Sequence, residues 1–401
     1  MNCRICNCQT SEILDLGSTP PANSLLTVDS ISQEEYPLIL EYCEECNNLQ
    51  LRDCLSADDL YKDYLYVTPN SSMLDGHYKY LTDYLFKQNY VTNNSFVVEV
   101  GSNIGYYLNY LKPKVEKVLG IDPAENICEM ANLNGIETIC DFFNAKSAKF
   151  ICTKYGKPDV IMARHCFAHN EDPHELMKGL KELLPLSGRV VIENAYALNT
   201  IENKEFDQIY HEHMFYYSIR SMTKLLKLHG LVLVDVLISL VHGGSIIFIA
   251  EHFTGQNQVN SSVSQYLANE TIKLNRSTLL NFSKSAHQTK SDLLKLINKI
   301  KIEGKKIFSY GATAKGNTLL NFCGITNNDI PFCVDNTEIK IGKFLPKSKI
   351  QIISESVDQT SPPDYFLLTA WNYKDEIIGK VRESGNYHSK FIVPFPVVHI
   401  I

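Results

Sequence analysis

The sequence predicts an α/β protein in three parts: a cysteine-rich module at the N-terminus, a central Rossmann-like domain, and a smaller Rossmann-like domain at the C-terminus. Three observations lead to this organisation. Two Cys-x-x-Cys pairs lie within the first fifty residues. Two later stretches each run from an apolar strand through a glycine-bordered turn into a helix. Between them, residues 261–302 contain no Gly or Pro and predict one or two helices, so the expected parts are 1–60, 61–260, 261–303 (linker helices) and 304–401.

The paired cysteines predict one structural zinc ion. Cys3 and Cys6 place two thiolates two residues apart, and so do Cys43 and Cys46, which lets each tight turn present both sulfurs to one tetrahedral ion. Four protein sulfurs leave no coordination position for water, so the predicted ion supports the fold and does no chemistry. The alternative is four free cysteines in accidental register.

The remaining composition limits the class of protein. Cys8 and Cys54 could compete as zinc ligands, whereas the other six cysteines are scattered singly and are expected to be buried small hydrophobes in a reducing compartment. A net charge of -7 argues against a non-specific nucleic-acid binder. No signal-like segment and no run of ~18 apolar residues is present, so we expect a cytoplasmic protein with no membrane partner, as a monomer or a homodimer.

The central domain is predicted from a strand, a glycine turn and an acidic residue. Ser95–Val100 is a short apolar run that leads into Gly101-Ser102-Asn103-Ile104-Gly105 and an amphipathic helix. A second strand, 115–121, ends in Asp122-Pro123, where a carboxylate can accept the hydroxyl groups of a ribose. The glycines let a cofactor approach the backbone.

Four further apolar runs favour one kind of Rossmann-like sheet. Residues 158–163 and 188–193 predict two more strands, and residues 231–239 and 245–251 predict an antiparallel hairpin at the sheet edge. A mostly parallel sheet that ends in a hairpin indicates a class I methyltransferase more than a dehydrogenase. The turn sequence GSNIG, which is not GxGxxG, also disfavours a dinucleotide.

Proton-transfer candidates gather in residues 205–213, in a loop or a short strand. His213 or His211 could remove a proton near neutral pH, Glu212 could orient or polarise the acceptor, and Tyr210 could donate to a developing oxyanion. A second metal held by His211 and His213 and a purely structural loop are the alternatives. Three more histidines are expected to shape a loop, not to bind metal: His165, His169 and His174.

The C-terminal domain repeats the strand–turn–helix pattern on a smaller scale. Residues 305–310 lead into the turn Gly311–Asn317, where backbone N–H groups and the charge of Lys315 could hold a phosphate. A simple tight turn explains the same residues equally well. Three later runs complete the predicted sheet: those ending at Asp335, at residues 350–353 and at residues 365–370.

These motifs, in this order, resemble the C-methyltransferases that act on nucleotide-linked 4-keto-deoxysugars. The resemblance spans nearly the whole chain: CRIC and ILDLGSTPPANSLL, VVEVGSNIG and GIDPAENI, FDQIYHEHMFYYS and HGGS, then YGATAKGNTLLNF, VDNTEIKIGKFLP and LLTAWNYKDEI. It implies methylation at C3 by S-adenosylmethionine after base-catalysed enolisation, with the nucleotide sugar held between the central and C-terminal domains.

The resemblance also assigns residues. It implies catalytic roles for His213 as the base, Glu212, Tyr210, and Tyr64 or Tyr66. The cofactor would contact Glu99, Gly101, Ser102, Asn103, Gly105, Asp122 and Pro123. The substrate would contact Gly243, Gly244, Ser245, Lys315 and Asn317. The zinc module is expected to hold residues 63–72 as a wall over the sugar.

Three departures from the family pattern are expected to lie around the methyl-donor pocket. Ile104 stands where the family turn has an acid, His165 begins the segment that the family writes N-V-F-A-H, and Asn194-Ala195 replaces F-P in E-F-P-Y. These changes motivate a second hypothesis, a keto-sugar epimerase or isomerase that keeps enolisation and loses methylation. A third is a non-catalytic subunit that binds sugar nucleotides, which the presence of Tyr210, Glu212 and His213 disfavours.

Overall fold

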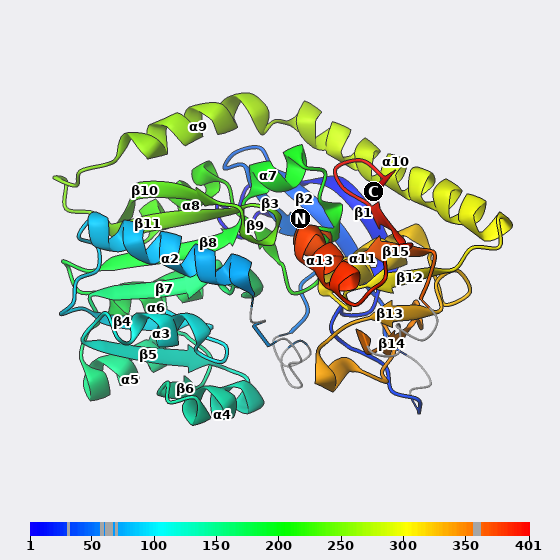
Figure 1. Ribbon diagram of the computed structural model, residues 1–401. Helices are drawn as coiled ribbons and strands as arrows, with labels where there is room; N and C mark the ends of the chain where they lie inside the picture. The colour runs from blue at the N-terminus through cyan, green and yellow to red at the C-terminus, as the bar shows by residue number, and fades with distance from the viewer. Residues whose placement is uncertain (30–32, 57–59, 61–66, 69–70, 356–361) are drawn as a thin grey trace.

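A computed structural model describes residues 1–29, 33–56, 60, 67–68, 71–355 and 362–401. The described strands form three sheets, of four, seven and six strands, which correspond to the N-terminal, central and C-terminal parts of the chain (Figure 1). The predicted α/β class with two Rossmann-like sheets is confirmed. The limits between the parts stay a prediction.

The N-terminal sheet is antiparallel and holds both cysteine pairs at one end. Its order is β1 (Ser11–Thr19), β2 (Tyr36–Cys43), β3 (Asn48–Leu51) and β9 (Phe215–Tyr216). Each Cys-x-x-Cys turn is closed by a bond from the following asparagine: Asn7 N–H to the Cys3 carbonyl and Asn47 N–H to the Cys43 carbonyl. Both asparagines have positive φ, 62° and 56°, a conformation that Asn tolerates better than most residues.

The four sulfurs of the two turns form one cluster. The ligand atoms of Cys3, Cys6, Cys43 and Cys46 all lie within 4.8 Å of one another, and it is the one such metal-binding group among the described residues. The Cys3–Cys46 and Cys6–Cys43 sulfurs are 3.6 Å and 3.4 Å apart. A tetrahedral zinc ion with bonds of about 2.3 Å needs sulfur separations of about 3.8 Å. The cluster therefore fits one zinc ion, and Cys8 and Cys54 lie outside it.

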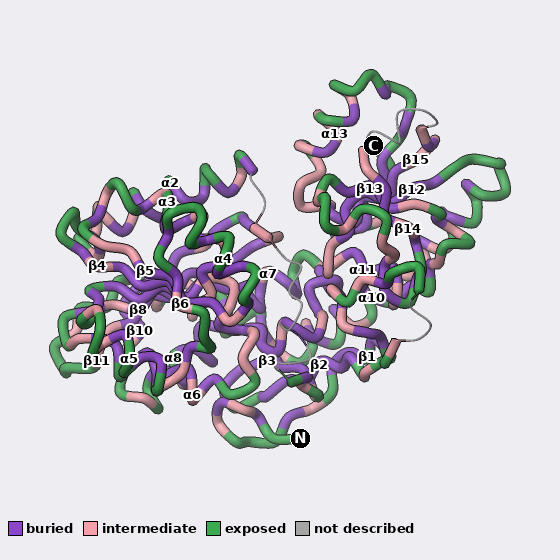
Figure 2. Tube along the Cα trace, turned by 90° about the horizontal axis from the view of Figure 1, so that it is seen from below, coloured by how far each residue is buried: buried purple, intermediate pink, exposed green. Residues whose placement is uncertain are grey.

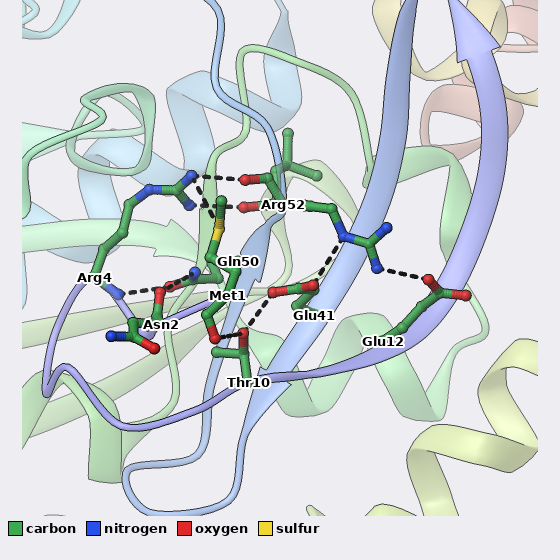
Figure 3. A network of polar contacts seen from close by, with 9 residues as sticks. Met1, Asn2, Arg4, Thr10, Glu12, Glu41, Gln50 and Arg52 are labelled. Carbon is green, nitrogen blue, oxygen red and sulfur yellow. Dashed lines mark hydrogen bonds and ion pairs between the residues drawn. The ribbon is translucent and has the colours of Figure 1, made fainter.

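A polar network fastens the first turn to the sheet (Figure 3). The Arg52 guanidinium bonds the carboxylates of Glu41 and Glu12 at 2.9 Å and 2.6 Å. Thr10 donates to the other oxygen of Glu41, and Arg4 donates to the carbonyl oxygens of Leu51 and Arg52. These contacts hold β1, β2 and the first cysteine turn together next to the metal ligands.

The central sheet has the predicted mixed topology. Its order is β10–β11–β8–β7–β4–β5–β6, parallel from β8 to β6, with an antiparallel hairpin at the other edge. The strands are β4 (Phe96–Val100), β5 (Lys117–Asp122), β6 (Thr138–Cys140), β7 (Val160–Arg164), β8 (Arg189–Ala195), β10 (Leu231–Ser239) and β11 (Ser245–His252). The helices are α2 (Ser72–Lys87), α3 (Tyr106–Leu111), α4 (Glu125–Leu133), α5 (Ala145–Tyr155), α6 (Pro173–Leu183), α7 (Ala197–Glu202) and α8 (Ile219–Leu228).

Two helices span from the central sheet to the C-terminal sheet. They are α9 (Ser261–Lys273) and α10 (Arg276–Ile302), and they arch over the molecule in Figure 1. The C-terminal sheet has the order β14 (Gln351–Ile353), β13 (Phe332–Val334), β12 (Ile307–Tyr310), β15 (Tyr365–Leu368), β16 (Lys390–Val393) and β17 (His399–Ile400). Its described helices are α11 (Ala314–Cys323) and α13 (Lys374–Glu383).

The three sheets share a buried core. Strand β9, which lies far along the chain, completes the N-terminal sheet by pairing with β3, so the zinc module includes residues that follow His213. Leu26 forms an isolated bridge with Phe344 of the C-terminal part. Figure 2 shows buried positions along the strands of all three sheets, and one cluster of buried apolar residues runs through all three parts.

Two local expectations differ from the structure. The strand expected at 115–121 begins at Lys117, because Pro113 and the turn after α3 occupy the preceding residues. Residues 205–213 contain no strand: a short 3-10 helix, η2 (Phe206–Gln208), is followed by turns. The side chains of His211 and His213 therefore do not share a face.

No helix in the described part of the chain is long and apolar enough to cross a membrane.

Removal of the metal should destabilise the whole protein, because the zinc module shares its core with the other two parts. We expect Cys43→Ser to lose the ion and to lower the midpoint of thermal unfolding by roughly 10 °C, since structural zinc contributes several kcal/mol. Metal content and thermal unfolding measured together check this. Cys8→Ser is the matched control and should keep one zinc per chain; zinc retained by Cys43→Ser would contradict the assignment.

Candidate active site

Two cavities meet at three histidines. One, here called the Rossmann cavity, has a volume of about 450 Å³ and lies at the carboxyl ends of β4, β5 and β7. The other, the interdomain cavity, has a volume of about 300 Å³ and lies between the central and C-terminal sheets. The side chains of His165, His169 and His242 line both. Groups bound in the two cavities would therefore face each other across these imidazoles.

The Rossmann cavity has the chemistry that S-adenosylmethionine requires. The Asp122 carboxylate ends β5 and accepts bonds from the backbone N–H groups of Asn103 (2.9 Å) and Ala124 (3.1 Å). Each carboxylate oxygen keeps a second lone pair for a ribose hydroxyl. A Cβ on Gly101 would lie 2.5 Å from Cys166, so only glycine lets the chain turn here. The lining includes five of the predicted cofactor residues: Gly101, Ser102, Asn103, Asp122 and Pro123.

The other two predicted cofactor residues do not line this cavity. Glu99 lies behind it and forms a buried ion pair of 2.7 Å with Arg164, whose guanidinium stacks 4.1 Å from the Tyr107 ring centroid. A Cβ on Gly105 would meet Ile136 at 2.8 Å, so this glycine serves the packing of the turn. Both residues support the wall, and Arg164, the partner of Glu99, lines the cavity. Contact of Glu99 and Gly105 with the cofactor stays a prediction.

Tyr210 and His213 form a hydrogen-bonded pair in the interdomain cavity. The Nδ1 atom of His213 lies 3.1 Å from the carbonyl oxygen of Gln208, which can only accept, so Nδ1 carries the proton. The Nε2 atom is then the acceptor of the Tyr210 hydroxyl, at 2.5 Å. The pair therefore consists of a neutral imidazole with its basic nitrogen covered by a phenol.

Burial lowers the pKa of three histidines of the site. Burial, with His169 and Lys315 nearby, holds the pKa of His213 well below its ordinary value. Burial and His165 lower the pKa of His169 to about 4, and burial holds the pKa of His242 well below its ordinary value. His169 and His242 therefore place no positive charge beside a cationic cofactor near neutral pH.

Glu212 enters the interdomain cavity from the same turn and is bound by the zinc module. Its Oε1 accepts a bond of 2.8 Å from the Asn23 side-chain amide. Its Oε2 is buried and has no hydrogen-bond partner among the described residues. Burial raises the pKa of Glu212, and the bond from Asn23 opposes that shift. The cavity thus contains one carboxylate oxygen that is ready to bind a ligand group.

Lys315 lines the interdomain cavity but is held by the protein itself. Its ammonium donates to the His242 carbonyl oxygen at 2.7 Å and lies 5.3 Å from the Trp371 ring centroid. Trp371 donates to the Asp207 carboxylate at 2.7 Å. Burial raises the pKa of Asp207 to about 6 and that of Glu205 to about 7, and Lys315 opposes both shifts. This network joins the C-terminal sheet to the loop that carries His242.

The remaining predicted substrate residues do not line either cavity. A Cβ on Gly243 would lie 2.4 Å from the Glu205 carboxylate, and a Cβ on Gly244 would lie 2.5 Å from the Asn199 amide. Ser245 donates to the Val241 carbonyl oxygen, and Asn317 donates to the Ala22 carbonyl oxygen. The HGGS motif thus shapes the turn that presents His242, which lines both cavities. Contact of Gly243, Gly244, Ser245 and Asn317 with the substrate stays a prediction.

The departures from the family pattern are spread more widely than expected. His165 lines both cavities, and Ala195 lines the interdomain cavity, whereas Ile104 and Asn194 line neither. His165 has a positive φ of 53°, and its ring meets that of His242 edge-on at 4.5 Å. Tyr64 and Tyr66, the two predicted tyrosines of the catalytic set, lie outside the described residues.

The structure separates the remaining histidines. His211 lies 3.3 Å from the Pro37 carbonyl oxygen, away from the Tyr210–His213 pair, so the metal site proposed for His211 and His213 is wrong for the described structure. His174 contacts the Ile5 carbonyl oxygen and His229, next to the zinc ligands. His165 and His169 were expected only to shape a loop, yet they line both cavities. Their position in the N-V-F-A-H segment was the one signal that could have identified them.

Comparisons with known proteins identify the family of the chain. Three family models match the chain: a zinc binding domain over residues 3–61, a methyltransferase domain over 78–236, and a C-methyltransferase C-terminal domain over 240–396. The chain is 35% identical to the C-methyltransferase NovU of Streptomyces niveus over 404 residues, which cover 100% of this chain and 96% of that protein.

The solved structures that resemble this chain match less than half of it. The N-methyltransferase NodS of Bradyrhizobium japonicum is 12% identical, with a TM-score of 0.35, and the match covers 46% of this chain and 98% of that one. The magnesium protoporphyrin IX methyltransferase of Synechocystis is 15% identical, with a TM-score of 0.35, and covers 46% and 90%.

A side chain added at Gly101 should weaken cofactor binding. Gly101→Ala introduces a Cβ at a φ of +64° against Cys166, and we expect the affinity for S-adenosylmethionine to fall roughly ten-fold or more. Gly76→Ala in α2 is the control, because its Cβ meets nothing within 4 Å; it should leave affinity unchanged and stabilise the fold by up to about 1 kcal/mol. Calorimetric titration and urea unfolding measure both quantities, and equal affinities for the two variants would contradict the placement of the cofactor.

Proposed function

The chain belongs to the S-adenosylmethionine-dependent C-methyltransferases, and we propose that its acceptor is a nucleotide-linked 4-keto-deoxysugar, methylated at C3 after enolisation. The observation that carries the proposal is the pairing of Tyr210 with His213 in a cavity that meets the Rossmann cavity at three histidines. Carbon is a poor nucleophile until a proton is removed, and an adjacent ketone makes such a proton acidic. A neutral base beside a phenol suits that chemistry.

The charges of the interdomain cavity support a nucleotide-linked acceptor. Three lysines line it: Lys315 from the first turn of α11, Lys340 and Lys380. Lys340 lies 3.8 Å from Asp335, and Lys380 lies 3.2 Å from Glu376. A diphosphate requires cations of this kind, and Asp335 directly follows β13, where a ribose-binding acid stands in Rossmann-like sheets. We place the nucleotide on this side and the sugar toward Tyr210.

The acceptor itself would free the base. In the structure, the Tyr210 hydroxyl occupies the lone pair of His213 Nε2. A ketone oxygen placed next to Tyr210 competes for that proton, and when the hydroxyl turns toward the ketone, Nε2 becomes available. His213 then takes the proton from the neighbouring carbon while Tyr210 donates to the oxygen that gains negative charge. The enolate carbon is left facing the three histidines.

The remaining residues orient the reactants and keep water out. S-adenosylmethionine in the Rossmann cavity supplies the electrophilic methyl group. His165, His169 and His242 line both cavities, and the lowered pKa values of His169 and His242 keep these two rings from repelling a sulfonium. Lys315 fixes the His242 loop through its carbonyl oxygen. The alternative, a keto-sugar isomerase, needs the same base, and membership among C-methyltransferases favours transfer.

The Tyr210–His213 pair should control loss of the acceptor proton. With a nucleotide-linked 4-keto-deoxysugar in deuterated water and S-adenosylhomocysteine in place of the methyl donor, we expect the wild type to exchange the C3 proton. His213→Ala and Tyr210→Phe should each slow exchange roughly 100-fold or more and keep the affinity for S-adenosylmethionine. Mass spectrometry of the recovered sugar measures exchange.

The matched control lies two residues from the base. His211→Ala removes an imidazole that faces the Pro37 carbonyl oxygen, so exchange per folded molecule should stay within about two-fold of the wild type. Exchange at the wild-type rate in His213→Ala, or the same loss in His211→Ala, would overturn the assignment of the base.

A further inference from the structure

We propose that Asn23, which belongs to the zinc module, is a positioning residue of the active site: it holds Glu212 so that the free carboxylate oxygen binds a hydroxyl group of the acceptor sugar. The inference rests on the proposed function and names a recognition element within the same cavity. It starts from one contact, between residues 189 positions apart in the chain, that both line the interdomain cavity.

The contact leaves one specific atom for a ligand. Asn23 donates from Nδ2 to Glu212 Oε1 at 2.8 Å, which fixes the rotation of the carboxylate. Glu212 is buried, and its Oε2 has no hydrogen-bond partner among the described residues. Buried polar atoms nearly always have a partner, so an unpartnered carboxylate oxygen in a cavity wall marks a place for a donor from the ligand. Among the groups of a deoxysugar, a hydroxyl is that donor.

The segment that carries Asn23 is held at both ends by the C-terminal part of the molecule. Asn317 donates to the Ala22 carbonyl oxygen at 2.6 Å, and Asn321 donates to the Thr19 hydroxyl at 2.8 Å. Leu26 bridges to Phe344. These contacts place residues 19–26 between the first and third sheets. The Asn23 side chain is directed at Glu212 in the turn at residues 205–213. The zinc module thereby contributes a side chain to the acceptor site.

The position of Glu212 explains why its orientation matters. Glu212 stands between Tyr210 and His213 in sequence, so a hydroxyl bound at Oε2 fixes the sugar relative to the pair that acts on its ketone and its acidic proton. A misplacement of about 1 Å at a reacting carbon costs orders of magnitude in rate. Loss of the Asn23 donor leaves the carboxylate free to rotate and leaves Oε1 without its bond.

A double-mutant cycle tests the inference on the full-length zinc-loaded protein. Asn23→Leu keeps the approximate side-chain volume and removes the donor; it is made in the wild type and in Glu212→Ala. The readouts are kcat/KM for methyl transfer to the keto-sugar nucleotide and its dissociation constant in the presence of S-adenosylhomocysteine, which remains measurable when turnover is slow. Zinc content and thermal unfolding verify that each variant is folded.

If Asn23 acts through Glu212, Asn23→Leu in the wild type weakens acceptor binding and lowers kcat/KM by roughly 10- to 100-fold. In the Glu212→Ala background, the same substitution changes acceptor affinity by less than about two-fold. Ser24→Ala, which removes an exposed hydroxyl next to Asn23 outside the cavities, should change neither readout more than about two-fold. Equal losses from Asn23→Leu in both backgrounds would show a merely structural role and overturn the inference. A wild type that neither exchanges nor methylates the sugar would instead overturn the proposed function.

Discussion

The turn at residues 205–213, where we place the base His213, depends on contacts from all three parts of the protein. Asn23 of the zinc module binds Glu212, Trp371 of the C-terminal part binds Asp207, and Thr318 of α11 donates to the Ile209 carbonyl oxygen. The turn itself leads directly into β9, which completes the zinc-module sheet. A buried turn without regular secondary structure keeps its shape only while such partners hold it. The site is therefore a property of the assembled chain and not of the central domain alone.

This constraint gives the structural zinc an indirect part in the chemistry. The four zinc-binding sulfurs lie at one end of the first sheet, and their cysteines line neither cavity. The ion orders the module whose residues 19–26 reach into the interdomain cavity. The predicted wall at residues 63–72 lies mostly outside the described residues; Thr68 is described and bonds the Asn103 side chain beside the Rossmann cavity. The module thus contacts the acceptor side through Asn23.

Prediction from sequence succeeded where the signal is local. The two Cys-x-x-Cys turns and the apolar strand that ends before Gly101 are each local patterns, so spacing predicted the metal-binding cluster and the first strand of the central sheet. The catalytic roles of Tyr210, Glu212 and His213 stay predictions. The contact of Asn23 with Glu212 and the meeting of His165 with His242 depend on how distant elements pack, which no spacing reports. The HGGS motif was placed at the substrate because a short motif does not tell which of its residues faces a cavity.

We place the methyl donor and the acceptor sugar on opposite sides of the three histidines, with the ketone of the sugar at Tyr210. A crystal structure of the zinc-loaded protein with S-adenosylhomocysteine and a nucleotide-linked 4-keto-deoxysugar tests it most directly. We expect S-adenosylhomocysteine in the Rossmann cavity and the sugar in the interdomain cavity. Its ketone should lie within hydrogen-bond reach of Tyr210, and its C3 should face Nε2 of His213. A sugar bound away from Tyr210, or on the same side of the histidines as S-adenosylhomocysteine, would contradict this placement of donor and acceptor.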